Sequence, residues 1–235
     1  ETIEFDDMVQ QNPTALQDLY KSQKDGFLVR NFLSPTEVAA VVDNMSIMET
    51  KNVAETSVGY TYPMIFAEFS LRNDELNKEE LQVKSEGYFK DNLQYAKEFK
   101  DDFGFDLKSK LDSFFEKISG GSGIEVPSGM GDVGKYPFGN FRCLRPNGGG
   151  MAIHCGNFFQ DRFRLFYSHL TESAKVVDQM SYFIVIQEPE SGGALEVFDM
   201  RWEHGQSKVD NLENEEVILS NGSKYFRIET VTERS

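Results

Sequence analysis

The chain has 235 residues, of which 39% are hydrophobic and 27% are charged, a composition typical of a globular domain with a full core. Its 39 acidic against 24 basic residues leave a net charge of −15, which disfavours binding to the phosphates of nucleic acid. No apolar run is long enough to span a membrane, and two cysteines are too few for a disulfide framework. Twenty phenylalanines indicate a core or cavity packed with aromatic rings.

The first elements in chain order are a helix, a strand and a second helix. Asn12 as the cap and proline in the first turn predict a helix over residues 12–24. Residues 27–33 follow as a short strand. Ser34 and Glu37 then have the spacing of a capping box, with proline at the first helical position and valines at helical spacing behind it.

The next part of the first half is predicted to be extended and then helical. Residues 50–70 are rich in Thr, Val, Tyr and Phe, which is typical of extended chain. From 74 to 119 the apolar spacing is helical, and a glycine cluster at 120–123 ends it. The cluster has no Gly-Lys-Ser/Thr ending, so a nucleotide phosphate loop is disfavoured.

The second half is predicted to consist mainly of strands separated by Gly-rich and Pro-rich turns. The predicted strands are 138–144, 151–155, 181–187, 194–199, 216–220 and 225–230. A helical stretch is expected at 160–173, and the acidic run 210–216 is expected to be a solvated loop. The pattern predicts one α+β domain over residues 1–235, with mainly helical support in 1–120 and a sandwich or jelly-roll core in 124–235.

The chain contains three histidines, His154, His169 and His204. His154 ends a short predicted strand after a Gly-rich turn, and strand alternation puts it on one face with Ala152 and opposite Cys155. Such a ring can point into a barrel, although a hydrogen-bonded core histidine is the more frequent outcome for an isolated position. His169 is expected to have a structural role in a helix, and His204 is expected in an exposed hairpin loop.

Three segments together resemble the 2-oxoglutarate/iron(II)-dependent oxygenases. Residues 25–38 resemble the N-terminal segment of that superfamily, 142–159 its first metal-binding strand, and 181–199 the hairpin that leads into its middle strands. The Arg201-Trp202 pair that follows is similar to a subgroup of free-amino-acid halogenases and related hydroxylases. The resemblance implies a double-stranded β-helix, that is, a cupin-like jelly roll, with N-terminal and flanking helices.

This resemblance also implies the cofactors and the first metal ligand. Family members bind Fe(II) through two histidines and a carboxylate, and 2-oxoglutarate chelates the metal. His154 takes the position of the first ligand. The carboxylate position is occupied by Gly156, as in the halogenases, where chloride fills the vacancy that the missing carboxylate leaves.

The other site residues implied by the resemblance fall in and after the last predicted strand. The second histidine of the family falls on Phe226, and a phenyl ring has no lone pair to give to iron. Arg234 is the match for the arginine that binds the distal carboxylate of 2-oxoglutarate. Apart from the resemblance, Arg142 and Arg145 precede the strand of His154, and one of them, with Arg142 preferred, is a candidate for a substrate carboxylate. Arginines beside a turn are more often exposed, and Arg234 equally suits an exposed position.

Two readings of function follow. The first is an oxidoreductase, an iron(II)/2-oxoglutarate-dependent oxygenase or halogenase that modifies a free amino acid or similar small polar substrate. The second, motivated by Phe226 and Gly156, is a metal-poor, non-catalytic relative that uses the scaffold for binding or as a subunit of a larger assembly. A sugar-binding cupin is a weaker third. Because no signal peptide precedes the domain, a cytoplasmic location is expected, and oligomers are compatible with either reading.

Overall fold

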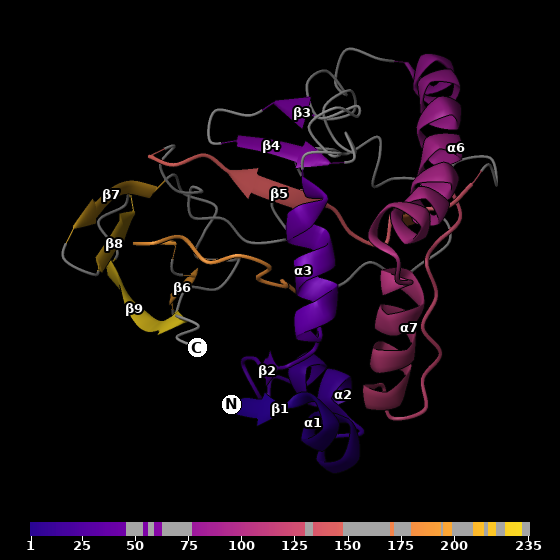
Figure 1. Cartoon of the computed structure of the whole chain (residues 1–235). Coiled ribbons are helices and arrows are strands. Elements are labelled where there is room, and N and C mark those ends of the chain that lie inside the picture. The colour runs from indigo at the N-terminus through magenta and orange to yellow at the C-terminus, as the bar shows by residue number, and fades with distance from the viewer. Residues whose placement is uncertain are drawn as a thin grey trace.

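The computed structural model describes eleven stretches of the chain (Figure 1). They are residues 1–45, 54–55, 59–62, 77–129, 134–147, 170–171, 180–193, 195–198, 209–213, 216–219 and 224–231. Within them the fold combines helices with three small sheets, of two, three and four strands, so the α+β class is confirmed. None of the described helices has both the length and the apolar character that crossing a bilayer requires.

The N-terminal strands and helices form a small unit that packs on a later helix. Strands β1 (Thr2–Glu4) and β2 (Leu28–Arg30) pair in parallel, and helices α1 (Phe5–Gln11) and α2 (Ala15–Tyr20) connect them. Its core is shared with the later helix α7 (Leu107–Ile118) and contains Met8, Ala15, Phe114 and Ile118.

The helix predicted over residues 12–24 is shorter than expected and begins later. Asn12 does not begin it, because the Asn12 amide donates to the Met8 carbonyl and thereby ends the preceding helix, α1. Thr14 is the residue that precedes α2. The helix α1 itself was not predicted from the sequence, since its seven residues give too short an apolar pattern.

Helix α3 (Pro35–Asp43) begins where the sequence predicts. The Ser34 hydroxyl accepts from the Glu37 amide at 3.3 Å, and the Glu37 carboxylate accepts from the Ser34 amide at 2.7 Å. This reciprocal capping satisfies two backbone donors that a helix terminus otherwise leaves unpaired. Val41 is buried on the inner face of the helix.

The helical pattern of residues 74–119 corresponds to two helices, α6 (Lys78–Phe103) and α7. Asn77 caps the first of them in a second capping box. Gly104 ends α6 with φ of +75°, a left-handed conformation that glycine adopts without steric cost. Asp106 then caps α7 by accepting from the Ser109 amide.

The three-stranded sheet joins distant parts of the chain. Strands β3 (Ala54–Glu55), β4 (Gly59–Tyr62) and β5 (Phe141–Leu144) pair antiparallel in that order. Tyr60 lies opposite Cys143, and Tyr62 lies opposite Phe141. These four side chains share the face that packs toward α6.

The four-stranded sheet is built from the end of the chain. Strands β6 (Leu195–Phe198), β7 (Val209–Glu213), β8 (Glu216–Leu219) and β9 (Lys224–Val231) lie in the order β6-β9-β8-β7, and all pairs are antiparallel. Figure 1 shows this curved sheet on the side of α3 away from α6 and α7. The strand predictions for 194–199, 216–220 and 225–230 are confirmed.

Two predictions for the second half are wrong. The acidic run 210–216 is not a loop: most of it lies in β7, which pairs with β8 at Glu213 and Glu216, because backbone pairing in a short hairpin does not require uncharged side chains. Residues 181–187 do not form a strand. The expected hairpin partner, β6, pairs with β9 instead.

The described strands do not show the expected jelly roll. A jelly roll stacks eight strands in two sheets around one core, whereas these strands form three separate small sheets. The strand predicted at 151–155 and most of the helix predicted at 160–173 lie outside the described residues; Leu170 and Thr171 are helical.

Candidate functional site

The sequence singles out five residues for the site, and the structure describes two of them. The five are His154, Gly156, Arg234, Arg142 and Phe226. His154, Gly156 and Arg234 lie outside the described residues, as do His169 and His204. Arg142 lies on β5, and Phe226 lies on β9. The structure therefore gives the environment of a proposed substrate-binding arginine and the strand pairing of a proposed ligand position.

Arg142 lies on the outer face of the three-stranded sheet. It is opposite Thr61 of β4, and its side chain is exposed. Its neighbours in sequence, Phe141 and Cys143, are half-buried and pack against the aromatic cluster on the other face. The strand thus turns the Arg142 side chain away from the aromatic core, to the exposed face of the sheet.

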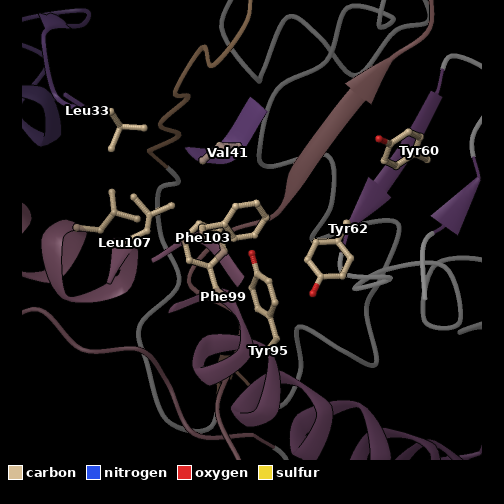
Figure 2. Packing of buried hydrophobic residues seen from close by; sticks show 9 residues of the cluster. Leu33, Val41, Tyr60, Tyr62, Tyr95, Phe99, Phe103 and Leu107 are labelled. Atoms are coloured by element: carbon tan, nitrogen blue, oxygen red, sulfur yellow. The ribbon is translucent and has the colours of Figure 1, made fainter. Parts of the chain in front are cut away.

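The inner face of the same sheet carries an aromatic cluster shared with α6 (Figure 2). The Tyr95 ring is stacked on Phe138 with centroids 5.3 Å apart, and Phe99 is stacked on Phe141 at the same distance. Tyr62 meets Tyr95 edge to face at 5.5 Å. Offset and edge-to-face contacts of this kind are the favourable geometries for aromatic rings, so the Phe-rich composition builds a ring-packed core here.

Burial keeps the Tyr95 hydroxyl of this cluster protonated. Removal from solvent raises the pKa of Tyr95 well above its ordinary value, and the neighbouring Tyr62 and Tyr182 add to the effect. Sequence reasoning singled out phenylalanines but missed Tyr60, Tyr62 and Tyr95. The spacing of Tyr95, Phe99 and Phe103 at i, i+4 and i+8 on one helix is the signal that could have found Tyr95.

Residues 180–193 contact this core through Tyr182. Its hydroxyl donates to the Phe138 carbonyl, and its ring lies 5.1 Å from that of Phe115. Burial, with a smaller contribution from Asp112, raises the pKa of Tyr182 to about 12. Ile184 and Ile186 pack on the aromatic cluster, while Val185 between them is 53% exposed.

The proposed ligand His154 lies outside the described residues, so the donor set of a metal site is described only in part. No group of three His, Cys, Asp or Glu side chains able to hold a metal occurs among them. Phe226, where the resemblance places the second imidazole, offers no lone pair, and the residue opposite it in the sheet is Glu216. A first-row divalent ion needs several protein donors to compete with water.

Comparison with protein families assigns the chain to a class. Residues 2–230 match the family model described as "Carrier-protein-independent halogenase WelO5". Iron(II)/2-oxoglutarate-dependent halogenases are the class that this model represents, which confirms the resemblance to the 2-oxoglutarate oxygenases. The match extends over almost the whole length, and the chain belongs to the WelO5 family. A comparison with curated proteins gave no match.

Proposed function

We propose that the protein is an iron(II)/2-oxoglutarate-dependent halogenase-like enzyme that acts on a free amino acid or a similar small polar substrate. The family match over residues 2–230 is the observation that carries the proposal. The motif His154-Cys155-Gly156 supports halogenation in particular, since glycine leaves room and an open charge site for chloride. Independence from a carrier protein, in the family's description, agrees with a free substrate.

Four residues are proposed for the roles in this reaction. His154 is the metal ligand, Gly156 opens the halide position, and Arg234 binds the distal carboxylate of 2-oxoglutarate. Arg142 is proposed to bind a substrate carboxylate, and its exposed position on β5 supports access from solution. Bound iron and 2-oxoglutarate would supply the oxidising chemistry. A guanidinium suits both arginine roles because it can form two parallel hydrogen bonds to a carboxylate.

The alternative is a metal-poor relative that uses the same scaffold for binding or as a subunit of an assembly. Phe226 favours it, because a phenyl ring offers no lone pair to a metal. The two functions differ in one measurable property, which is whether Fe(II) and 2-oxoglutarate bind together at His154.

The deciding experiment is an anaerobic binding titration of the purified protein with Fe(II), 2-oxoglutarate and chloride. If the protein is the enzyme, ligand at about 100 times its Kd should add about 2.7 kcal/mol to the free energy of unfolding. For a chain of this size, that corresponds to a rise in melting temperature of about 5–10 °C. His154→Ala should abolish the rise, whereas His169→Ala, a matched histidine deletion, should retain it. An unchanged melting temperature in the unmodified protein would favour the metal-poor reading.

Turnover is tested separately with a panel of free amino acids. Succinate release and a chlorinated product that depend on both chloride and His154 would support halogenation. Gly156→Asp restores a carboxylate at the proposed halide position, so this variant should lose the chloride dependence. If the unmodified protein formed only hydroxylated products, with or without chloride, the halogenase assignment would be contradicted. The assignment to the oxygenases would still stand.

A further inference from the structure

The turn after strand β5 contains an asparagine that glycine follows, in the sequence Pro146-Asn147-Gly148. Asn147 is exposed and has a φ of +58°, in the left-handed region that asparagine and glycine adopt more readily than other residues. A proline followed by a residue with positive φ is the pattern of a type II turn. The turn therefore explains why asparagine is accepted at position 147, and it leaves the residue open to solvent.

Asn31 has the same φ of +58° and is also exposed, but its side chain is held in place. Its amide nitrogen donates to the Glu4 carboxylate at 2.7 Å, and a phenylalanine follows it in the sequence. Among the described residues, Asn147 has no such hydrogen bond of its side chain. The glycine that follows Asn147 has no side chain to shield its main-chain nitrogen. The two asparagines thus share a backbone φ and differ in the properties that control attack on the side-chain amide.

From this contrast we infer that Asn147 is a site of spontaneous deamidation, a covalent modification of the folded protein that needs only water. The main-chain nitrogen of Gly148 forms a bond to the side-chain carbonyl carbon of Asn147, and the side-chain nitrogen leaves as ammonia. Water then opens the cyclic imide at either of its carbonyls, which gives aspartate or isoaspartate. No atom is oxidised or reduced, and the inference does not depend on the proposed function.

The two products should differ in their effect on the turn. Both add one negative charge at position 147, two residues after Arg145. Aspartate tolerates a positive φ, as asparagine does, so the aspartate product should keep the turn. Isoaspartate adds a methylene group to the main chain, so the isoaspartate product should lose the spacing that the turn requires.

Peptide mapping of aged protein tests the inference. A folded sample and a guanidinium-unfolded sample are kept at mildly alkaline pH and physiological temperature, and each asparagine peptide is quantified by mass spectrometry over time. In the folded sample, Asn147 should deamidate at least about tenfold faster than Asn31, because glycine leaves the attacking nitrogen unshielded. The rate at Asn147 should also lie within about threefold of its rate in the unfolded sample, since an exposed turn gives little protection. An Asn147 that reacts in the unfolded sample but stays intact in the folded protein would overturn the inference.

Two variants at the same position complete the test. Asn147→Asp supplies the aspartate product directly, so the chromatographic retention of its peptide distinguishes aspartate from isoaspartate in the aged sample. This variant should melt within about 2 °C of the unmodified protein, and a larger drop would contradict the turn on which the inference depends. Asn147→Gly is compatible with the positive φ and removes the amide, so its aged sample should lack the acidic form that maps to this turn. Asn221, which glycine also follows, is quantified from its own peptide so that its product is not assigned to position 147.

Discussion

At the scale of single residues, Glu37 shows how a local signal acquires a distant partner. Its carboxylate completes the capping box with Ser34 and also accepts from the Lys110 ammonium of α7 at 2.6 Å. Lys110 in turn lies over the Phe32 ring, 5.4 Å from its centroid. The capping box could be predicted from four consecutive residues, but Lys110 is 73 positions away and nothing in its own neighbourhood identifies the acid that it pairs with.

The ion pair predicts a pH dependence of stability. Partial burial raises the pKa of Glu37, but the hydrogen bonds from Lys110 and Ser34 outweigh it and hold the pKa below the ordinary 4.5. A depressed pKa in the folded state adds stability that is fully present above the unfolded pKa and is lost as the pH falls through the folded value. Glu37→Gln should therefore cost about 1–2 kcal/mol of unfolding free energy at neutral pH and much less in acid.

Urea unfolding of the unmodified protein and of Glu37→Gln, at neutral pH and at a pH below the folded value, measures this difference. Glu116→Gln serves as the control, because Glu116 is an exposed acid on α7. A stability difference for Glu37→Gln that does not shrink in acid would contradict the role of the charge.

At the scale of elements, α6 is organised by one aromatic face. Tyr95, Phe99 and Phe103 are all buried, while Leu93 of the same helix is 53% exposed. Phe99 is central to the cluster: its ring meets Phe103 at 4.5 Å and is stacked on Phe141 of β5. The helix could be predicted from this spacing, but the strands that cover its face could not, since they come from both sides of α6 in the sequence.

Truncation of the central ring measures the contribution of this packing. Phe99→Ala should lower the unfolding free energy by about 3–5 kcal/mol, because it removes a fully buried ring and leaves a cavity. Leu93→Ala on the exposed side of α6 should change it by no more than about 0.5 kcal/mol. Denaturant unfolding followed by far-UV circular dichroism compares the two. Similar losses in both variants would mean that the aromatic cluster does not hold α6 in place.

At the scale of the whole molecule, contacts between distant segments determine the arrangement. The Gly120 amide donates to the Pro13 carbonyl, and the Gln17 amide group donates to the Ser119 carbonyl, which ties the N-terminal unit to the end of α7. These contacts form in a chain that carries a net charge of −15. Self-repulsion of that size opposes the compact state and is weakened by salt.

The charge predicts that salt stabilises the fold. Raising sodium chloride from about 20 mM to about 200 mM shortens the screening length severalfold, and the urea midpoint at neutral pH should rise as a result. Near the isoelectric point of about 4.7 the net charge disappears, so the same change in salt should have little effect. A urea midpoint that falls with salt at neutral pH would show that attractive surface pairs outweigh the net repulsion.

The sequence by itself determined the helices with strong caps, the general α+β class, the superfamily resemblance and the motif around His154. These are local properties: a cap, an apolar spacing or a short motif is complete within a few consecutive residues. The tertiary structure alone decided that β6 pairs with β9, that Tyr182 brings 181–187 against α7 without a strand forming, and that Phe226 is opposite Glu216 in the sheet register. The reason is physical, since alternating side chains mark a segment as extended but every strand offers the same backbone donors and acceptors along its edges.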